Sequence, residues 1–132
     1  MLRGFIERRV DERVEELLHT RWKKQVENEI ICMLETEYNL YEVISSKPFF
    51  LAGMLDLSTL KEGDTVTLAI YAKIKADGEF IKHAGFDVTG PVDDPAVLIE
   101  PTMFSDSGRI TIKQTTGRPR RISYVIMSKD ES

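Results

Sequence analysis

The chain has 132 residues, of which 42% are hydrophobic and 30% charged, and its formal net charge is −4. This length and composition predict one soluble domain with its own core, with or without an appendage. The negative balance gives no electrostatic reason to expect nucleic-acid binding. No apolar run approaches the ~20 residues that a membrane-spanning helix needs, so we expect no membrane insertion.

The first residues also lack the pattern of an export signal. Met1 to Ile6 is followed at once by the charged residues Glu7-Arg8-Arg9, which leaves no apolar signal segment. We therefore expect cytoplasmic synthesis. Cys32 is the only cysteine, so it cannot form an intramolecular disulfide. A packed core residue is the favoured interpretation, and a disulfide between two copies is the alternative.

Residues 4–35 are predicted to form a helix, because they contain no proline and no glycine after Gly4. The apolar run from Ile30 to Leu34 is either the buried end of this helix, which we favour, or the start of a strand. The apolar residues that recur at steps of four are Ile6, Val10, Val14, Leu18, Trp22, Val26 and Ile30, with Leu17 beside them. Such a stripe winds slowly around a helix, so it fits either contacts with other copies or a helix lying across its own domain. We divide the chain into a helical arm, residues 1–36, and a β domain, residues 37–132.

The clearest strand signal is Thr65–Lys75, where apolar and mostly polar residues alternate strictly. Val66, Leu68 and Ile70 share one parity, and Thr67 and Tyr71 lie on the other. This period of two is typical of a strand with one buried and one wet face.

Turn signals separate six further runs of strand composition. The expected strands are Leu40–Ile44, Phe49–Leu57, Thr65–Lys75, Glu79–Val88, Ala96–Met103, Arg109–Thr116 and Arg121–Met127. About seven short strands at regular spacing predict an antiparallel β-sandwich, jelly-roll or Ig-like, preceded by the helix. Asp77-Gly78 and Gly117-Arg118-Pro119 are predicted to close hairpins. Pro101 cannot donate to a ladder, so its strand should lie at a sheet edge or end there.

Catalytic and metal-binding motifs are absent from the sequence. The two histidines, His19 and His83, have no partner motif, and no serine elbow or phosphate-binding glycine loop is present. Loop carboxylates such as Asp64, Asp93 and Asp94 could bind calcium, but they lack the spacing of a dedicated loop. We predict a protein that is not an enzyme and that carries no cofactor and no metal.

Three residues form a candidate ligand surface. Tyr71 is expected on the wet face of its strand with Lys73 nearby, and Arg118 lies at a predicted hairpin tip. Aromatic and cationic side chains of this kind can bind sugars or acidic groups. An interface residue and a solvated turn are the alternatives.

The segment from Gly53 onward resembles small β-sandwich structural proteins encoded by phages, archaeal viruses and proviruses. The motifs that carry the resemblance are Asp56-Leu57-Ser58 with Leu60, Glu62-Gly63-Asp64-Thr65-Val66, Tyr71-Ala72-Lys73, Pro95-Ala96-Val97 and Gln114-Thr115-Thr116-Gly117-x-Pro119. They are motifs of turns and strands rather than of catalysis. The resemblance implies a virion or virus-associated structural protein that assembles with copies of itself and with other virion proteins.

These observations together predict a non-enzymatic structural or assembly protein that forms a homo-oligomer. Its interface is expected to bury Val10, Val14, Leu17, Leu18 and Trp22 against other copies. The alternative is a module that binds carbohydrate or another small ligand through Tyr71, Lys73 and Arg118.

Overall fold

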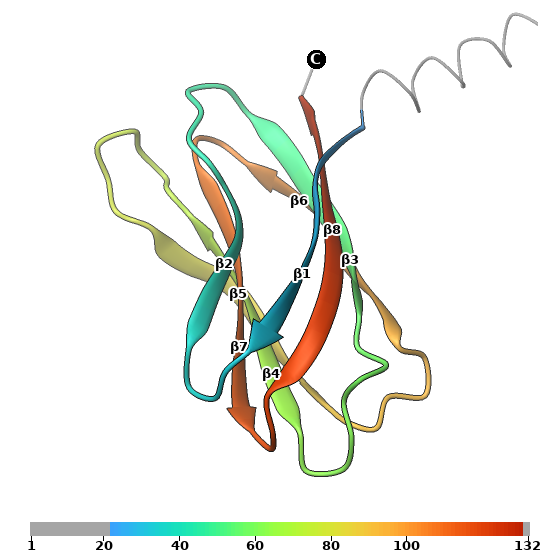
Figure 1. The fold of residues 1–132 in the computed structure, drawn as a ribbon. Coiled ribbons are helices and arrows are strands. Elements are labelled where there is room, and N and C mark those ends of the chain that lie inside the picture. Colours follow the sequence, from blue (N-terminus) through green and yellow to red (C-terminus); the bar gives the residue numbers. More distant parts are fainter. Residues whose placement is uncertain (1–21, 131–132) are drawn as a thin grey trace, which may run out of the picture.

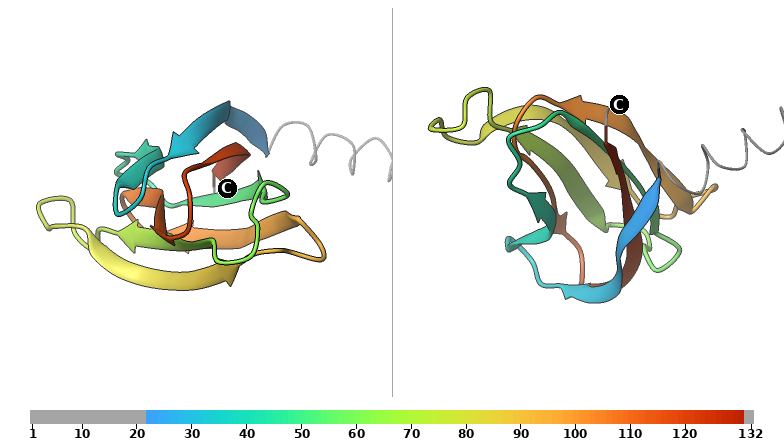
Figure 2. Two further views of the ribbon diagram at one scale, coloured as in Figure 1. Left: turned by 60° about the horizontal axis from the view of Figure 1, so that its bottom comes forward. Right: turned by 90° about the horizontal axis from the view of Figure 1, so that it is seen from above.

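A computed structural model describes residues 22–130, which form two packed four-stranded sheets (Figure 1). The strands are β1 (Lys23–Cys32), β2 (Glu37–Val43), β3 (Phe49–Asp56), β4 (Thr65–Ala72), β5 (Ile81–Thr89), β6 (Ala96–Phe104), β7 (Gly108–Thr116) and β8 (Arg120–Asp130). Figure 2 shows the sandwich from two further sides, with the start of β1 close to the end of β8.

The strand order is that of a jelly roll. One sheet has the order β1-β8-β3-β6 and the other β2-β7-β4-β5, and every pairing between these strands is antiparallel. Two interleaved sheets of four strands are the arrangement of double Greek-key jelly rolls. The predicted antiparallel sandwich is therefore confirmed, in its jelly-roll form and with eight strands instead of seven.

The extra strand is β1, and it shows that the predicted helix over residues 4–35 is wrong from Lys23 to Cys32. β1 pairs with β8 along its length, with Ile30 opposite Ile122. Val26 and Ile30 are four apart, a spacing that fits one face of a helix and equally one face of a strand. The sandwich therefore includes residues that precede the predicted boundary at 36, while the arm over residues 1–21 lies outside the described residues.

The core lies between the two sheets and is built from the inward-facing positions of each strand. Val66, Leu68 and Ile70 are buried, which confirms the alternation predicted for β4. The rings of Phe49 and Phe104 stack at 5.2 Å between centroids. The buried residues of this core are Cys32, Leu40, Phe49, Leu51, Leu55, Leu57, Leu60, Val66, Leu68, Ile70, Ile99, Phe104, Ile110, Ile112, Ile122, Tyr124 and Ile126.

β6 is an edge strand, as the proline in its sequence predicts. Its register against β3 shifts between Leu51 and Gly53, so that Pro101 lies in an irregular part of the ladder where no donor is required. Gly53 is needed on the other side, because a Cβ there would lie 2.6 Å from the carbonyl oxygen of Val125.

One of the two predicted hairpins is wrong. Asp77-Gly78 lies in the connection between β4 and β5, which do pair as neighbours. Gly117 to Pro119 instead connects β7 to β8, and these strands belong to different sheets. The sequence signal marks a tight turn correctly, but turn residues alone do not say whether the next strand stays in the same sheet.

We expect the thiol of Cys32 to be unreactive in the folded chain. Its side chain is fully buried, and burial raises the pKa of the thiol to about 11. Labelling with a thiol reagent at pH 8 should therefore be slow in buffer and fast in denaturing urea. Fast labelling of the native protein would contradict the packing described for β1. It would instead favour the alternative that Cys32 forms a disulfide between two copies.

Candidate functional site

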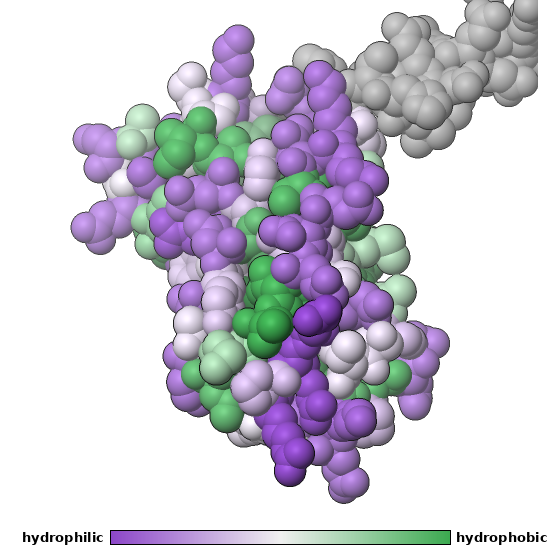
Figure 3. All heavy atoms as spheres, viewed as in Figure 1, coloured by the Kyte–Doolittle hydropathy of each residue, from purple (hydrophilic) through white to green (hydrophobic). Residues whose placement is uncertain are grey.

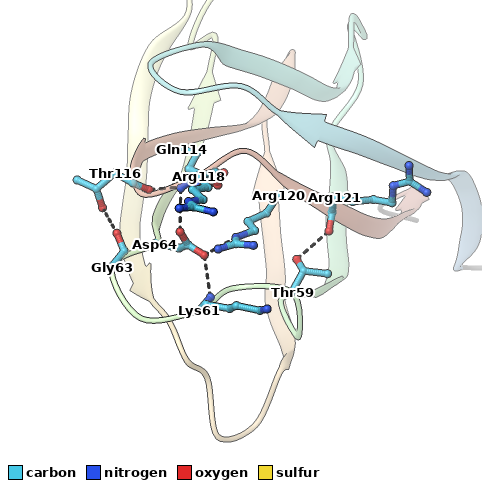
Figure 4. Close-up of polar contacts among 9 residues, drawn as sticks. All are labelled: Thr59, Lys61, Gly63, Asp64, Gln114, Thr116, Arg118, Arg120 and Arg121. Carbon is cyan, nitrogen blue, oxygen red and sulfur yellow. Dashed lines mark hydrogen bonds and ion pairs between the residues drawn. The ribbon is translucent and has the colours of Figure 1, made fainter.

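A buried carboxylate joins the loop before β4 to the turn between β7 and β8 (Figure 4). Asp64 is only 1% exposed, and its carboxylate accepts hydrogen bonds from the backbone N–H of Lys61 at 2.7 Å and of Arg118 at 3.0 Å. The guanidinium Nε of Arg120 donates to the same carboxylate at 2.5 Å. One side chain therefore fixes two loops that lie more than 50 residues apart in the sequence.

Gln114 and Gly117 also belong to this contact, which we call the Asp64 joint. Its members are Lys61, Asp64, Gln114, Gly117, Arg118 and Arg120. The Gln114 amide is buried and donates to the carbonyl oxygens of Thr116 and Arg118. Gly117 has a φ of +93°, and a Cβ at that position would overlap the carboxylate of Asp64. The Glu62-Gly63-Asp64 and Gln114 to Pro119 motifs, on which the sequence resemblance rests, thus meet in space as parts of one structural contact.

The electrostatics of the joint keep Asp64 ionised. Burial raises the pKa of this carboxyl group, but the hydrogen bonds from Lys61, Arg120 and Arg118 outweigh the burial, so the pKa lies below its usual value. Every polar contact of the carboxylate is made within the chain. The joint therefore stabilises the fold.

The outer face of the β2-β7-β4-β5 sheet is polar and extensively bonded. The Glu37 carboxylate accepts from the hydroxyl groups of Thr111, at 2.7 Å, and Tyr71, at 2.8 Å. These bonds hold the pKa of Glu37 below its usual value, and the bond to Glu37 raises the pKa of Tyr71. Arg109 donates to Glu42 at 2.7 Å beside them. Glu37, Tyr71, Thr111, Arg109 and Glu42 thus form hydrogen bonds with one another on this face.

The structure brings only two of the three candidate ligand residues near each other. The Arg109 guanidinium lies over the rings of Tyr71 and Phe80, and the ammonium of Lys73 lies 5.1 Å from the Phe80 ring centroid. Arg118 is at the other end of β7, beside Asp64. These three residues therefore do not form one surface, and a role in ligand binding for any of them stays a prediction.

The outer face of the β1-β8-β3-β6 sheet carries a patch of exposed apolar side chains on β3, β6 and β8. Antiparallel sheets normally place polar residues on their wet face, but outward positions in the middle of β3 and β8 are apolar here. Met54, Leu98 and Met103 are 45%, 54% and 55% exposed. We call this surface the apolar face; its members are Phe50, Ala52 and Met54 of β3, Leu98 and Met103 of β6, and Val125 and Met127 of β8.

A groove of about 560 Å³ continues the apolar face toward the far end of the sheet. Met54 and Val125 contribute apolar lining, and three carboxylates, those of Glu27, Glu29 and Asp56, also line it. Arg121 lies 3.6 Å from Glu29, and Lys24 lies 3.6 Å from Glu27, so two of the three carboxylates have one cation each beside them. We call this the acidic groove.

Trp22 marks the opposite end of the same sheet. The Lys129 ammonium lies 5.2 Å from the Trp22 ring centroid and 5.0 Å from that of Phe50, so Trp22 lies next to the apolar face. The other predicted interface residues, Val10, Val14, Leu17 and Leu18, lie outside the described residues.

Further apolar surface is visible at the open edge of the sandwich. Figure 3 shows apolar side chains between charged ones where β1 and β2 face the viewer. Ile31, Met33 and Leu34, at the connection between these strands, are 51%, 52% and 41% exposed.

The sequence reasoning missed the apolar face, although a signal for it was present. Phe49 to Leu55 is a run of apolar residues that is interrupted only by Gly53. Such a run is typical of a strand covered on both faces. The acidic groove had no such signal, because its residues come from different strands.

Neither a metal cluster nor a membrane-spanning helix is found within residues 22–130. No three His, Cys, Asp or Glu side chains of that part are grouped so as to hold a metal ion. No helix of the same range is long and apolar enough to cross a membrane.

Comparison with known proteins gives a fold likeness only. No family model matches the sequence, and no curated protein matches it. A chain of the Bacillus endospore appendages, a family of disulfide-linked pili, is 14% identical over 85% of this chain and 90% of that one, with a TM-score of 0.48. The VP2 subviral particle of infectious bursal disease virus is 12% identical over 83% of this chain, with a TM-score of 0.50. This chain spans 33% of the VP2 chain, and the likeness to VP2 supports the fold alone.

Replacing the buried carboxylate should destabilise the chain in a pH-dependent way. We expect Asp64→Asn to lower the free energy of unfolding at pH 7 by about 2 to 4 kcal/mol, because Arg120 loses its charged partner. Since the folded-state pKa of Asp64 is depressed, its contribution is present above about pH 4 and is lost as the pH falls through the folded value.

Urea unfolding at pH 7 and pH 3 measures both effects. Wild type should lose more stability than Asp64→Asn between these two pH values. Asp93→Asn, at an exposed loop carboxylate, is the matched control and should behave as wild type. An equal loss in wild type and Asp64→Asn would show that the Asp64 joint does not contribute as described.

Proposed function

We propose that this chain is a non-enzymatic structural protein that assembles with copies of itself through the apolar face. The observation that carries the proposal is the contrast between the two sheets, one with a bonded polar exterior and the other with exposed Met54, Leu98 and Met103. Contiguous apolar surface on a single chain is typical of sites of protein association.

Burial of the apolar face would contribute several kcal/mol to the free energy of association. A side chain such as leucine or methionine is worth about 1.5 to 3 kcal/mol when it is fully buried, so three half-exposed residues offer about 1 kcal/mol each. Phe50, Val125 and Met127 add partly exposed surface. Methionine is common at contact surfaces because its flexible side chain adapts to a partner.

We assign residues 1–21 to the same assembly, as the sequence analysis predicts for Val10, Val14, Leu17 and Leu18. The support is that these residues join the sandwich at Trp22, next to the apolar face. We further propose cytoplasmic synthesis and a role in a virion or a virus-associated structure. That finer proposal is supported by the sequence resemblance, and the jelly-roll likeness to the viral VP2 chain is compatible with it.

Charge placed on the apolar face should prevent association. We expect the wild-type chain to be oligomeric by light scattering, and the double variant Met54→Lys, Leu98→Lys to need at least about tenfold more protein to associate, because two lysines would have to be desolvated. The matched control is Ile74→Lys, which changes a residue that is 68% exposed in the β4–β5 connection.

A deletion variant tests the proposed self-assembly independently. Removing residues 1–21 should reduce association while leaving β1 in place; a cut near Glu35 would also remove β1 and is uninformative. A wild-type chain that stays monomeric at millimolar concentration would contradict the proposed function.

A further inference from the structure

We propose that residues 2–10 of a second copy of this chain bind in the acidic groove, an inference that rests on the proposed self-assembly and names its contact. The groove combines an apolar lining, Met54 and Val125, with the carboxylates of Glu27, Glu29 and Asp56. A suitable occupant must therefore supply both apolar and cationic side chains.

Residues 2–10 have that composition. Leu2, Phe5, Ile6 and Val10 are apolar. The same stretch contains three arginines, Arg3, Arg8 and Arg9, against the single carboxylate of Glu7.

The next residues have the opposite charge balance, and so does the opposite end of the receiving sheet. Residues 11–18 contain four carboxylates, Asp11, Glu12, Glu15 and Glu16, against one arginine, Arg13. Lys129 of β8 lies at the Trp22 end of the sheet, whereas Lys24 of β1 pairs with Glu27 of the groove. A segment whose first residues occupy the acidic groove therefore places its acidic part nearer Lys129, and charge complementarity favours this orientation of the segment on the face.

The lengths also agree. On β8, the outward positions from Lys129 to Ser123 cover six residues, or about 20 Å of strand. If Ile6 to Leu18 form the helix expected from the sequence, their twelve-residue separation spans about 18 Å. The segment can thus cover the apolar face and reach the acidic groove at the same time.

The connection at Trp22 favours a neighbouring copy as the donor of the segment. Only His19, Thr20 and Arg21 separate Leu18 from Trp22. β1 runs from Lys23 toward the groove residues Glu27 and Glu29, so a segment that lies over its own sheet would have to reverse direction within these three residues. Donation to a second copy avoids this reversal and links the copies.

Mixing two charge-reversed variants of the full-length chain tests whether the segment binds in the groove and whether it comes from a second copy. One variant carries Arg8→Glu and Arg9→Glu, and the other carries Glu27→Lys and Glu29→Lys, all at the proposed contact. Each variant alone should require at least about tenfold more protein to associate than wild type. A 1:1 mixture should associate again, because the R8E/R9E segment fits the E27K/E29K groove of the other variant.

The controls separate the inference from folding effects and from the proposed function. Glu62→Lys with Glu79→Lys reverses two exposed carboxylates away from the groove and should associate as wild type, and thermal melts of all variants should match. Variants that associate like wild type would overturn the groove contact while leaving self-assembly intact. Variants that lose association but do not recover it when mixed would overturn donation between copies. A monomeric wild-type chain would instead overturn the proposed function itself.

Discussion

The structure depends on one constraint, the cost of leaving the outward apolar positions of β3 and β8 in water. Each sheet must bury its inner face, and both do so against each other. The β2-β7-β4-β5 sheet then presents polar residues that bond to one another, as Glu37 does with Tyr71 and Thr111. The β1-β8-β3-β6 sheet presents Met54, Leu98 and Met103 instead. The sandwich therefore has an apolar core, one polar outer face, and one outer face with the exposed apolar side chains that are typical of association sites.

The Asp64 joint serves the fold rather than this face. It ties the loop before β4 to the turn after β7, and its hydrogen bonds are all internal. The two sequence motifs that meet there account for much of the resemblance to viral β-sandwich proteins. These motifs therefore meet in a contact that stabilises this fold, and the case for assembly rests on the apolar face.

Local patterns predicted most of the strands but not how they combine. The alternation of Val66, Leu68 and Ile70 was sufficient to predict β4, because one buried face imposes a period of two. β1 was predicted as helix because Val26 and Ile30 fit both periods. The apolar run at β3 could have indicated the apolar face. The acidic groove could not be predicted, since Glu27, Val125 and Met54 become neighbours only through the register of β1, β8 and β3.

Hydroxyl-radical footprinting of the full chain at low and high concentration tests most directly whether copies meet on the apolar face. Methionine oxidation can be read residue by residue, and Met54 and Met103 belong to this face, whereas Met33 lies at the β1–β2 connection with a similar exposure of 52%. We expect Met54 and Met103 to become protected as the chain associates, while Met33 stays reactive. Unchanged oxidation of Met54 and Met103 in an associated sample would contradict it.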